Sequence, residues 1–316
     1  MGNGITRAVV VREFGGPEAL EVVEQPLPEP GPGQVRIAVE AAAVNPVDLL
    51  TRAGGTVAVG FTAPRAQYGI GWDVAGRVDA VGAGAGFAVG DRVIGCIDRL
   101  DLTTGGYAEH VVLDAAAVGR APRDATPAEA ATIPLNALTA DQALDLLGLP
   151  AGSTLLVTGA AGGVGGFAVE LAVLRGLRVA ALAGADDEKL VRQLGATHFI
   201  PRDVPNVGDA VRAWAPGGAD GVLDTAGLRE AALEALRGGG AFVAFGHGAD
   251  PVPRRGTRVA NVWIRADGRR LTEFSALADA GRISLRVAAT YPLAEAPAAH
   301  ARLAAGGVRG RLVLLP

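Results

Sequence analysis

The amino-acid sequence predicts an α/β protein in which a doubly wound parallel sheet is joined to a smaller β-barrel-like domain. Up to about residue 122, short apolar or alternating runs such as VRIAVE are bounded by Gly and Pro, as in a compact β domain. From Thr126 onward, runs with helical spacing alternate with apolar strands, as in TLLVT, GFAVELAVLRG and LRVAALA. Strands that alternate with helices of this length favour a parallel sheet.

The change of pattern divides the chain of 316 residues into two expected domains. Residues 1–122 form the β-rich domain and residues 123–266 form the domain with alternating strands and helices. The last segment has its own sequence of elements, namely a helix at 271–280, a strand near 286–290, a helix at 294–305 and the strand RLVLL. We expect residues 267–316 to return to the first domain and complete it.

Charge, hydropathy and cysteine usage exclude several classes of protein. The formal net charge of −4 gives no electrostatic footprint for nucleic acid or an anionic membrane. The most apolar region, 155–183, is interrupted by charged residues and glycines, so no membrane-spanning segment is expected. Cys96 is the single cysteine, which excludes an internal disulfide and indicates a reducing compartment. We therefore expect a cytoplasmic protein without nucleic-acid or membrane partners, in which Cys96 is a small buried group.

A glycine-rich turn follows the strand TLLVT and precedes an amphipathic helix. Gly159, Gly162 and Gly165 would let the backbone turn tightly and approach a pyrophosphate, and the helix N-terminus would offer free amides to it. A second strand, LRVAALA, closes the βαβ unit, so the context is that of a Rossmann-type dinucleotide site. The predicted contacts of this turn are Gly159, Ala160, Gly162, Gly163, Val164 and Gly165.

The end of the second strand bears on the choice between NAD and NADP. An acidic residue there would bind the ribose diol of NAD, but the strand ends Ala-Leu-Ala at 181–183. Asp186 and Asp187 lie beyond it and fit the N-cap and first turn of the next helix. Lys189 and Arg202 could contact a 2′-phosphate, although each is as often plain solvated surface. The sequence therefore favours NADP(H).

Several blocks of sequence resemble, in the same order, those of the zinc-independent quinone oxidoreductase (zeta-crystallin-like) branch of the medium-chain dehydrogenase/reductase superfamily. They include AAAVNPVDLLTRAG, GWDVAGRV, VTGAAGGVG, ADGVLDTAG and VRGRLVLLP. The resemblance implies a GroES-like catalytic domain, a Rossmann domain, NADPH as hydride donor, and quinones or α,β-unsaturated carbonyls as acceptors. It also implies a homodimer through the edge strands of two Rossmann sheets, and VANVWIR at 259–265 matches that strand.

The residues at the metal positions of this superfamily predict that no metal is bound. Zinc-dependent relatives have a Cys in the first block and a His-Glu pair in the second, where this chain has Asn45 and Trp72-Asp73. The four histidines, at 110, 198, 247 and 300, have no ligand spacing. Near the expected 2′-phosphate, many relatives carry Ser and Tyr where this chain has Gly184 and Arg202. Gly184 and Arg202 are therefore further candidates for cofactor contact.

Without a metal, negative charge that grows on a carbonyl oxygen needs hydrogen-bond donors. Asn45 is the first candidate, with a local Asn-Pro turn as the alternative. Tyr68 and Tyr107 are possible proton donors, although a packing role is more frequent for each. Asp48 and Arg52 are four residues apart on an expected helical turn, so an ion pair is favoured over a catalytic role.

Two further positions are expected beside the cofactor. Thr139 matches a family position near the nicotinamide, with helix packing nearly as frequent a role. Phe245 and Gly246 follow the strand GAFVAF, at the sheet edge where ligands bind in such folds.

Three functions follow from these observations. The leading hypothesis is an NADPH-dependent oxidoreductase that reduces quinones or α,β-unsaturated carbonyls without zinc. The alternatives are an enoyl-thioester reductase of polyketide or fatty-acyl metabolism, and a non-catalytic NADPH-binding protein. The sequence does not identify the acceptor.

Overall fold

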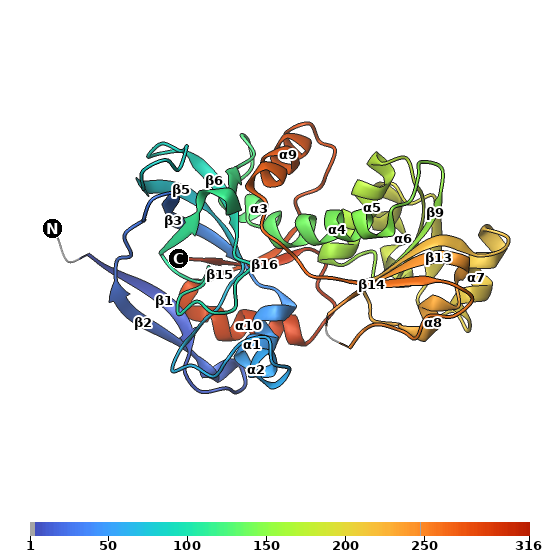
Figure 1. Cartoon of the computed structure of the whole chain (residues 1–316), viewed down its shortest axis with the longest axis horizontal. Helices are drawn as coiled ribbons and strands as arrows, with labels where there is room; N and C mark the ends of the chain where they lie inside the picture. The colour runs from blue at the N-terminus through green and yellow to red at the C-terminus, as the bar shows by residue number, and fades with distance from the viewer. Residues whose placement is uncertain (1–3, 247) are drawn as a thin grey trace. The chain divides into compact units, whose positions relative to one another are not determined.

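The computed structural model describes residues 4–246 and 248–316, and these divide into two compact units (Figure 1). Unit 1 comprises the described residues up to Leu135 together with Arg265–Gly281 and Leu285–Pro316. Unit 2 comprises the described residues of Asn136–Ile264 together with Arg282–Ser284. Both ends of the chain, blue and red in Figure 1, therefore belong to unit 1.

Unit 1 is built on two sheets. The smaller sheet has the antiparallel order β2-β1-β4, and the larger has the order β15-β16-β3-β5-β6-β8, with β7 paired to β3. Strand β16 pairs with β3, so the C-terminal segment is part of the larger sheet. The strands are β1 (Ile5–Val11), β2 (Leu20–Pro26), β3 (Gln34–Ala43), β4 (Tyr68–Gly69), β5 (Asp73–Val81), β6 (Arg92–Cys96), β7 (His110–Asp114), β8 (Val118–Arg120), β15 (Val287–Pro292) and β16 (Arg311–Leu315).

Short helices flank these sheets. They are α1 (Pro46–Arg52), α2 (Gly55–Ala58), α3 (Pro127–Ala130), α9 (Gly268–Asp279) and α10 (Ala296–Ala304). Helix α9 begins three residues before the predicted start at 271, because Asp267 caps it by accepting a hydrogen bond from Arg270 N at 2.9 Å. The core of the unit is a cluster of buried Val, Ile and Leu side chains, and Cys96 is buried, as predicted.

The boundary between the units falls later than the sequence places it. The sequence pattern changes at residue 122, whereas the contacts place the boundary after Leu135. Helix α3 packs against β3 and β5, and Leu135 N donates to the Asp73 carboxylate at 2.5 Å. The predicted helical run from Thr126 is therefore two helices, α3 in unit 1 and α4 (Pro134–Leu147), which crosses into unit 2.

Unit 2 is a parallel sheet of order β11-β10-β9-β12-β13-β14. From β9 the chain first winds through β10 to β11, and it then returns to the other side through β12, β13 and β14. This order confirms the predicted doubly wound, Rossmann-type fold and places its switch point between β9 and β12. The strands are β9 (Thr154–Thr158), β10 (Arg178–Ala183), β11 (His198–Pro201), β12 (Ala219–Asp224), β13 (Leu236–Phe245) and β14 (Arg258–Val262).

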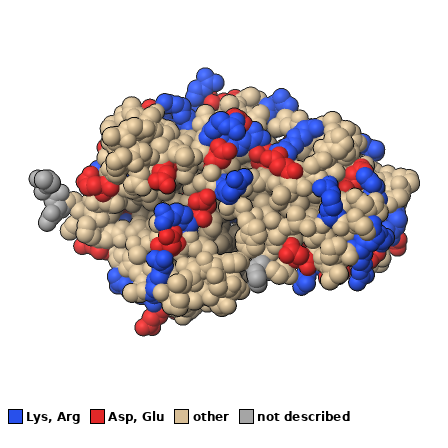
Figure 2. Space-filling view, in the orientation of Figure 1, with Lys and Arg blue, Asp and Glu red and all other residues tan. Residues whose placement is uncertain are grey.

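Helices cover this sheet, and every residue of β9 is buried. Besides α4, they are α5 (Gly163–Leu174), α6 (Glu188–Gln193), α7 (Val207–Trp214) and α8 (Glu230–Leu233). In the described part of the chain, no helix has both the length and the apolar character needed to cross a bilayer. On the face drawn in Figure 2, basic and acidic side chains are interspersed, as expected for a net charge of −4.

Candidate active site

The glycine-rich turn connects β9 to α5 in unit 2. Gly162 is the N-cap of α5, and the hydrogen bond from Gly166 N to Gly162 O, at 3.0 Å, is the first in its ladder. The amides of Gly163, Val164 and Gly165 precede that bond, so they have no acceptor one turn back in the helix. The turn therefore presents backbone donors at the positive end of a helix, which is an anion-binding arrangement.

Two of these glycines are required by the geometry of the turn. Gly159 has a φ of 60°, and a Cβ there would lie 2.7 Å from Thr225 Oγ1. A Cβ on Gly165 would lie 2.2 Å from Gly159 O, so the helix approaches the turn too closely for any side chain. The neighbouring Ala160 is buried, and its N–H donates to Leu182 O at 3.2 Å, which ties the turn to β10.

A buried hydrogen-bond cluster braces the turn from the side of β12. Thr158 Oγ1 donates to Asp224 Oδ1 at 2.7 Å and accepts from Ala226 N at 3.0 Å. Asp224 also accepts from the backbone of Leu228 and Arg229, at 3.0 and 2.7 Å. Sequence reasoning quoted the block ADGVLDTAG but assigned this carboxylate no role. Asp224 closes the end of β12 beside β9, at the switch point of the sheet.

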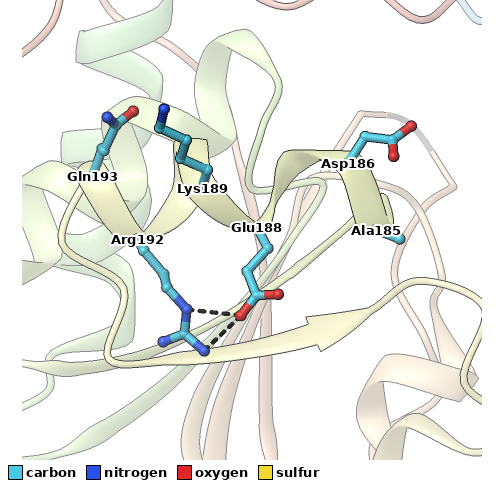
Figure 3. Close-up of a pocket in the computed structure, with 6 residues that line it drawn as sticks. All are labelled: Ala185, Asp186, Glu188, Lys189, Arg192 and Gln193. Carbon is cyan, nitrogen blue, oxygen red and sulfur yellow. Dashed lines mark hydrogen bonds and ion pairs between the residues drawn. The ribbon is translucent and has the colours of Figure 1, made fainter.

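The end of β10 carries no acidic side chain. Gly184 follows the strand, Asp186 and Asp187 lie in a short 3-10 turn, and Asp187 occupies the N-cap position of α6 without a side-chain capping hydrogen bond. Lys189 is exposed on α6 and has no hydrogen-bond or ion-pair partner within residues 4–246 and 248–316. Figure 3 shows its amine directed away from the neighbouring ion pair, in which Arg192 Nη2 lies 2.8 Å from Glu188 Oε1.

These residues line an open hollow of about 740 Å³ on α6 and the turn before it (Figure 3). Its lining residues are Ala185, Asp186, Glu188, Lys189, Arg192 and Gln193. Arg202 follows β11, and its backbone N donates to Ala183 O at 2.8 Å, beside the end of β10. The Arg202 side chain is exposed and, in the part of the chain that the structure describes, unpaired. The structure thus places two unpaired cations on the elements around the end of β10.

Phe245 ends β13 at the carboxyl edge of the sheet, and Gly246 follows it. Gly246 has a φ of 99°, and Asn261 holds it by accepting from its N–H at 3.2 Å and donating to its carbonyl at 2.5 Å. The next residue, His247, lies outside the described residues. Thr139 belongs to α4 and is nearly buried, with 8% of its surface exposed.

Asn45 lies in unit 1, where it is the fully buried N-cap of α1. Its Nδ2 donates to Asp73 Oδ2 at 2.7 Å and to Ala43 O at 3.3 Å, and its Oδ1 accepts from Arg311 Nη2. The side-chain amide is therefore occupied on both ends, mainly by partners far away in the sequence. We call Asn45, Asp73 and Arg311 the polar centre of unit 1.

Burial is unfavourable for the charged side chains of the polar centre. Burial raises the pKa of Asp73 to about 6, against the hydrogen bonds from Asn45 and Leu135 N and the nearby Arg311 charge. Burial lowers the pKa of the Arg311 guanidinium, against the negative charges of Asp73 and Asp48. The pair therefore depends on mutual compensation, as buried charges do.

Tyr68 is buried in β4, and its ring packs on Phe14 with 4.9 Å between centroids. Its hydroxyl oxygen accepts a hydrogen bond from Arg65 N at 2.8 Å. Within the described residues its own proton has no acceptor, so the phenol remains able to donate.

The ion pair predicted between Asp48 and Arg52 is wrong. Asp48 turns back to the helix N-terminus, where it accepts from Asn45 N at 2.8 Å, as a residue at the third helical position commonly does. Arg52 donates instead to Gly15 O and to His300 Nδ1, each at 3.2 Å. His300 comes from α10, and no local pattern in the sequence pointed to it.

The residues at the metal positions of the superfamily do not fit a zinc ion. Asn45 and Asp73 are hydrogen-bonded to each other, and the Trp72 indole offers no lone pair for a metal. Cys96 pairs with Asp73 across β5 and β6, and burial raises the pKa of its thiol. In the described ranges no cluster of three or more His, Cys, Asp or Glu could hold a metal.

Two family models match the chain. The alcohol dehydrogenase GroES-like domain covers residues 31–123, and a zinc-binding dehydrogenase model covers residues 194–314. A quinone oxidoreductase of Pseudomonas aeruginosa is 31% identical over 96% of this chain and 97% of its own. The polyketide synthase system protein NorB of Streptomyces orinoci is 35% identical over 96% of this chain, which spans only 14% of NorB.

Solved structures share the fold. An NAD-dependent alcohol dehydrogenase is 34% identical, with a TM-score of 0.87 over 98% of this chain and 99% of its own. A mycobacterial protein in complex with NADPH is 30% identical, with a TM-score of 0.81 over 98% of this chain and 100% of its own. The chain is thus an oxidoreductase of a nicotinamide-dependent family. It belongs to the medium-chain dehydrogenase/reductase superfamily, in the quinone oxidoreductase branch.

Proposed function

We propose that this protein is an NADPH-dependent reductase that transfers hydride to quinones or α,β-unsaturated carbonyls without zinc. The observation that carries the proposal is the turn from Gly159 to Gly165, because the amides of Gly163, Val164 and Gly165 form the positive end of α5 at the sheet's switch point. Two of its glycines are required by close contacts. That arrangement fits the pyrophosphate of a dinucleotide.

The preference for NADPH rests on the end of β10. Strand β10 itself ends without a carboxylate for a ribose diol, and Asp186 and Glu188 line the hollow only beyond it. Lys189 and Arg202 are exposed and unpaired among the described residues. Two such cations favour a 2′-phosphate. In this proposal Gly184, Phe245 and Gly246 complete the cofactor site along the carboxyl edge of the sheet.

The bound nicotinamide would supply a hydride, and the chain would bind, orient and protonate. A conjugated acceptor spreads the negative charge that hydride addition creates, so it suits a site without a Lewis acid. Tyr68 is proposed as proton donor, since its O–H has no acceptor among the described residues. Thr139 is proposed to contact the nicotinamide. Asn45, whose amide is occupied, is proposed to act by holding Asp73 in place.

The test is oxidation of NADPH, followed by its absorbance, with 1,4-benzoquinone, a simple enone and an enoyl thioester. We expect turnover with the first two and a much lower kcat/KM with NADH. The zinc-free mechanism predicts unchanged rates after treatment with a strong chelator. Tight NADPH binding with no oxidation by any acceptor would instead favour a non-catalytic binding protein.

A second candidate function is enoyl-thioester reduction. The similarity to a polyketide synthase system protein over 96% of this chain favours it. In the same assay, an enoyl thioester that exceeds the quinone and the enone in kcat/KM would select this function.

We also propose a homodimer formed through β14. This strand is an edge of the unit 2 sheet, and Trp263, which follows it, is 54% exposed. Light scattering should give twice the chain mass of 31.8 kDa. The expected cytoplasmic location, and the absence of nucleic-acid and membrane partners, stay predictions.

A further inference from the structure

A line of hydrogen bonds between side chains runs through the interior of unit 1 to the polar centre. We call it the wire, and its members are Arg52, His300, Tyr107 and Asp48. Arg52 Nη1 lies 3.2 Å from His300 Nδ1, His300 Nε2 lies 3.2 Å from Tyr107 Oη, and Tyr107 Oη lies 3.1 Å from Asp48 Oδ2. All four side chains are buried. We propose that the wire makes Asp48 a positioning residue for the Asn45–Asp73 pair, an inference that rests on the proposed function.

Asp48 joins the two segments that form this pair. Its carboxylate accepts from Asn45 N at 2.8 Å and from Gly71 N at 3.0 Å. Asn45 in turn donates to Asp73, and Gly71 lies two residues before Asp73. The segment at Gly71 is held by backbone hydrogen bonds from Tyr107 N to Ile70 O at 3.0 Å and from Gly106 N to Gly71 O at 2.9 Å. The Asp48 carboxylate therefore fixes the start of α1 against the start of β5.

The hydrogen bonds of the wire can be donated in only one direction, from Arg52 toward Asp48. A guanidinium only donates, so Arg52 requires a lone pair on His300 Nδ1. Neutral His300 must then carry its proton on Nε2 and donate it to the Tyr107 oxygen. The Tyr107 O–H is left to donate to Asp48. Burial lowers the pKa of His300 to about 3, with the Arg52 charge as a second cause, which keeps the imidazole neutral.

Reversal of the wire is blocked at Arg52. If Asp48 were to donate to Tyr107, the Tyr107 proton would meet the N–H of His300 Nε2. Moving that proton to Nδ1 would direct it at the Arg52 guanidinium. The wire therefore requires Asp48 Oδ2 to accept the Tyr107 proton, a role that a carboxylate fills more strongly than a neutral carboxyl group.

Several other groups face this carboxylate. Asp73 on β5 repels it, and Arg311 on β16 attracts it. Burial raises the pKa of Asp48 to about 7, and the hydrogen bonds from Asn45, Tyr107 and Gly71 oppose that rise. Loss of the Tyr107 hydroxyl should therefore raise the pH at which Asp48 becomes ionised.

Tyr107→Phe tests this role, with Tyr291→Phe as the matched control. Tyr291 is a half-buried tyrosine packed on the same core, with no hydrogen bond among the described residues. For wild type we expect turnover that falls as pH drops through about 7. In Tyr107→Phe the acid limb of kcat should move up by about one pH unit, while the control keeps the wild-type profile. An unmoved acid limb in a folded Tyr107→Phe variant would overturn the proposal.

NMR of the full wild-type chain tests the wire without any turnover. With ¹⁵N-labelled histidine, His300 should show the neutral Nε2–H tautomer from pH 5 to 9, and labelled Asp48 should titrate near neutrality. A His300 in the Nδ1–H form, or one that titrates near pH 6.5, would contradict the proposed direction of the hydrogen bonds in the wire. These readouts hold if Tyr107→Phe does not fold. If no acceptor is reduced, the proposed function fails, while the same spectra still decide the wire.

Discussion

The glycine-rich turn of unit 2 and the polar centre of unit 1 are held in place by different kinds of contact. The turn is made of backbone, and the close approach of Gly165 to Gly159 O lies within six residues, while Leu182 and Thr225 contact it from β10 and from the residue after β12. The polar centre is made of buried charged and amide side chains, with Asn45 and Arg311 separated by 266 residues in the sequence. The comparison teaches that the structure of a backbone site depends on the space around it. The structure of a buried side-chain site depends instead on charges that compensate one another.

The strongest test of this contrast removes a charge from the polar centre. Asp73→Ala removes the acceptor of Leu135 N and one of the two acceptors of Asn45 Nδ2, and it removes the negative charge that most strongly compensates the buried Arg311. We expect the free energy of unfolding to fall by about 3–5 kcal/mol, measured by urea denaturation. Asp186→Ala, at an exposed carboxylate, is the control. A loss below about 1 kcal/mol would show that buried charge does not limit this site.

The matching test adds volume to the turn. Gly165→Ala places a Cβ 2.2 Å from Gly159 O, whereas Gly162→Ala places one 3.1 Å from the same atom. Overpacking of about 3 kcal/mol should weaken NADPH binding roughly 100-fold in Gly165→Ala, and the effect of Gly162→Ala should be smaller. Titration calorimetry measures both. Equal affinities in the two variants would contradict the spatial explanation.

The pH dependence of stability sharpens the comparison further. Asp48 has a pKa of about 7 in the folded chain, above its usual value, so the folded state binds the proton more tightly and stability falls as pH rises from about 4 to about 7. In Asp48→Asn this loss between pH 5 and 8, about 3 kcal/mol, should disappear from the unfolding free energy. His300 acts in the opposite direction, since its lowered pKa costs stability as pH falls below 6.5. If the unfolding free energy changes with pH in the same way in wild type and Asp48→Asn, Asp48 is not a buried carboxyl group that titrates in this range.

The smallest expected effect concerns the exposed cations of unit 2. Lys189→Ala and Arg202→Ala should each weaken NADPH binding by about 1 kcal/mol, or several-fold, because solvent screens both charges. Binding of NADH should stay the same. Arg212→Ala, at an exposed arginine paired with Asp209, is the control. Equal weakening of NADH and NADPH binding would show that these side chains do not contact the 2′-phosphate.

Asp48 shows how sequence spacing can mislead. A carboxylate and a guanidinium four residues apart on a helix predict an ion pair. At the third position of α1, the carboxylate instead meets the Asn45 N–H and two partners from outside the helix, Gly71 and Tyr107. Helical spacing describes an isolated helix surface, whereas α1 is buried on this side, and there the tertiary partners determine the pairing.

The sequence by itself determined the doubly wound sheet of unit 2 and the position of its glycine turn, because the alternation of strand, turn and helix is local in the chain. Only the tertiary structure decided the boundary after Leu135 and the composition of the wire. Tyr107 and His300 are 193 residues apart, and Arg52 and His300 are 248 apart. No periodic pattern encodes such a contact, since it exists only after both sheets of unit 1 have formed and removed these polar groups from water.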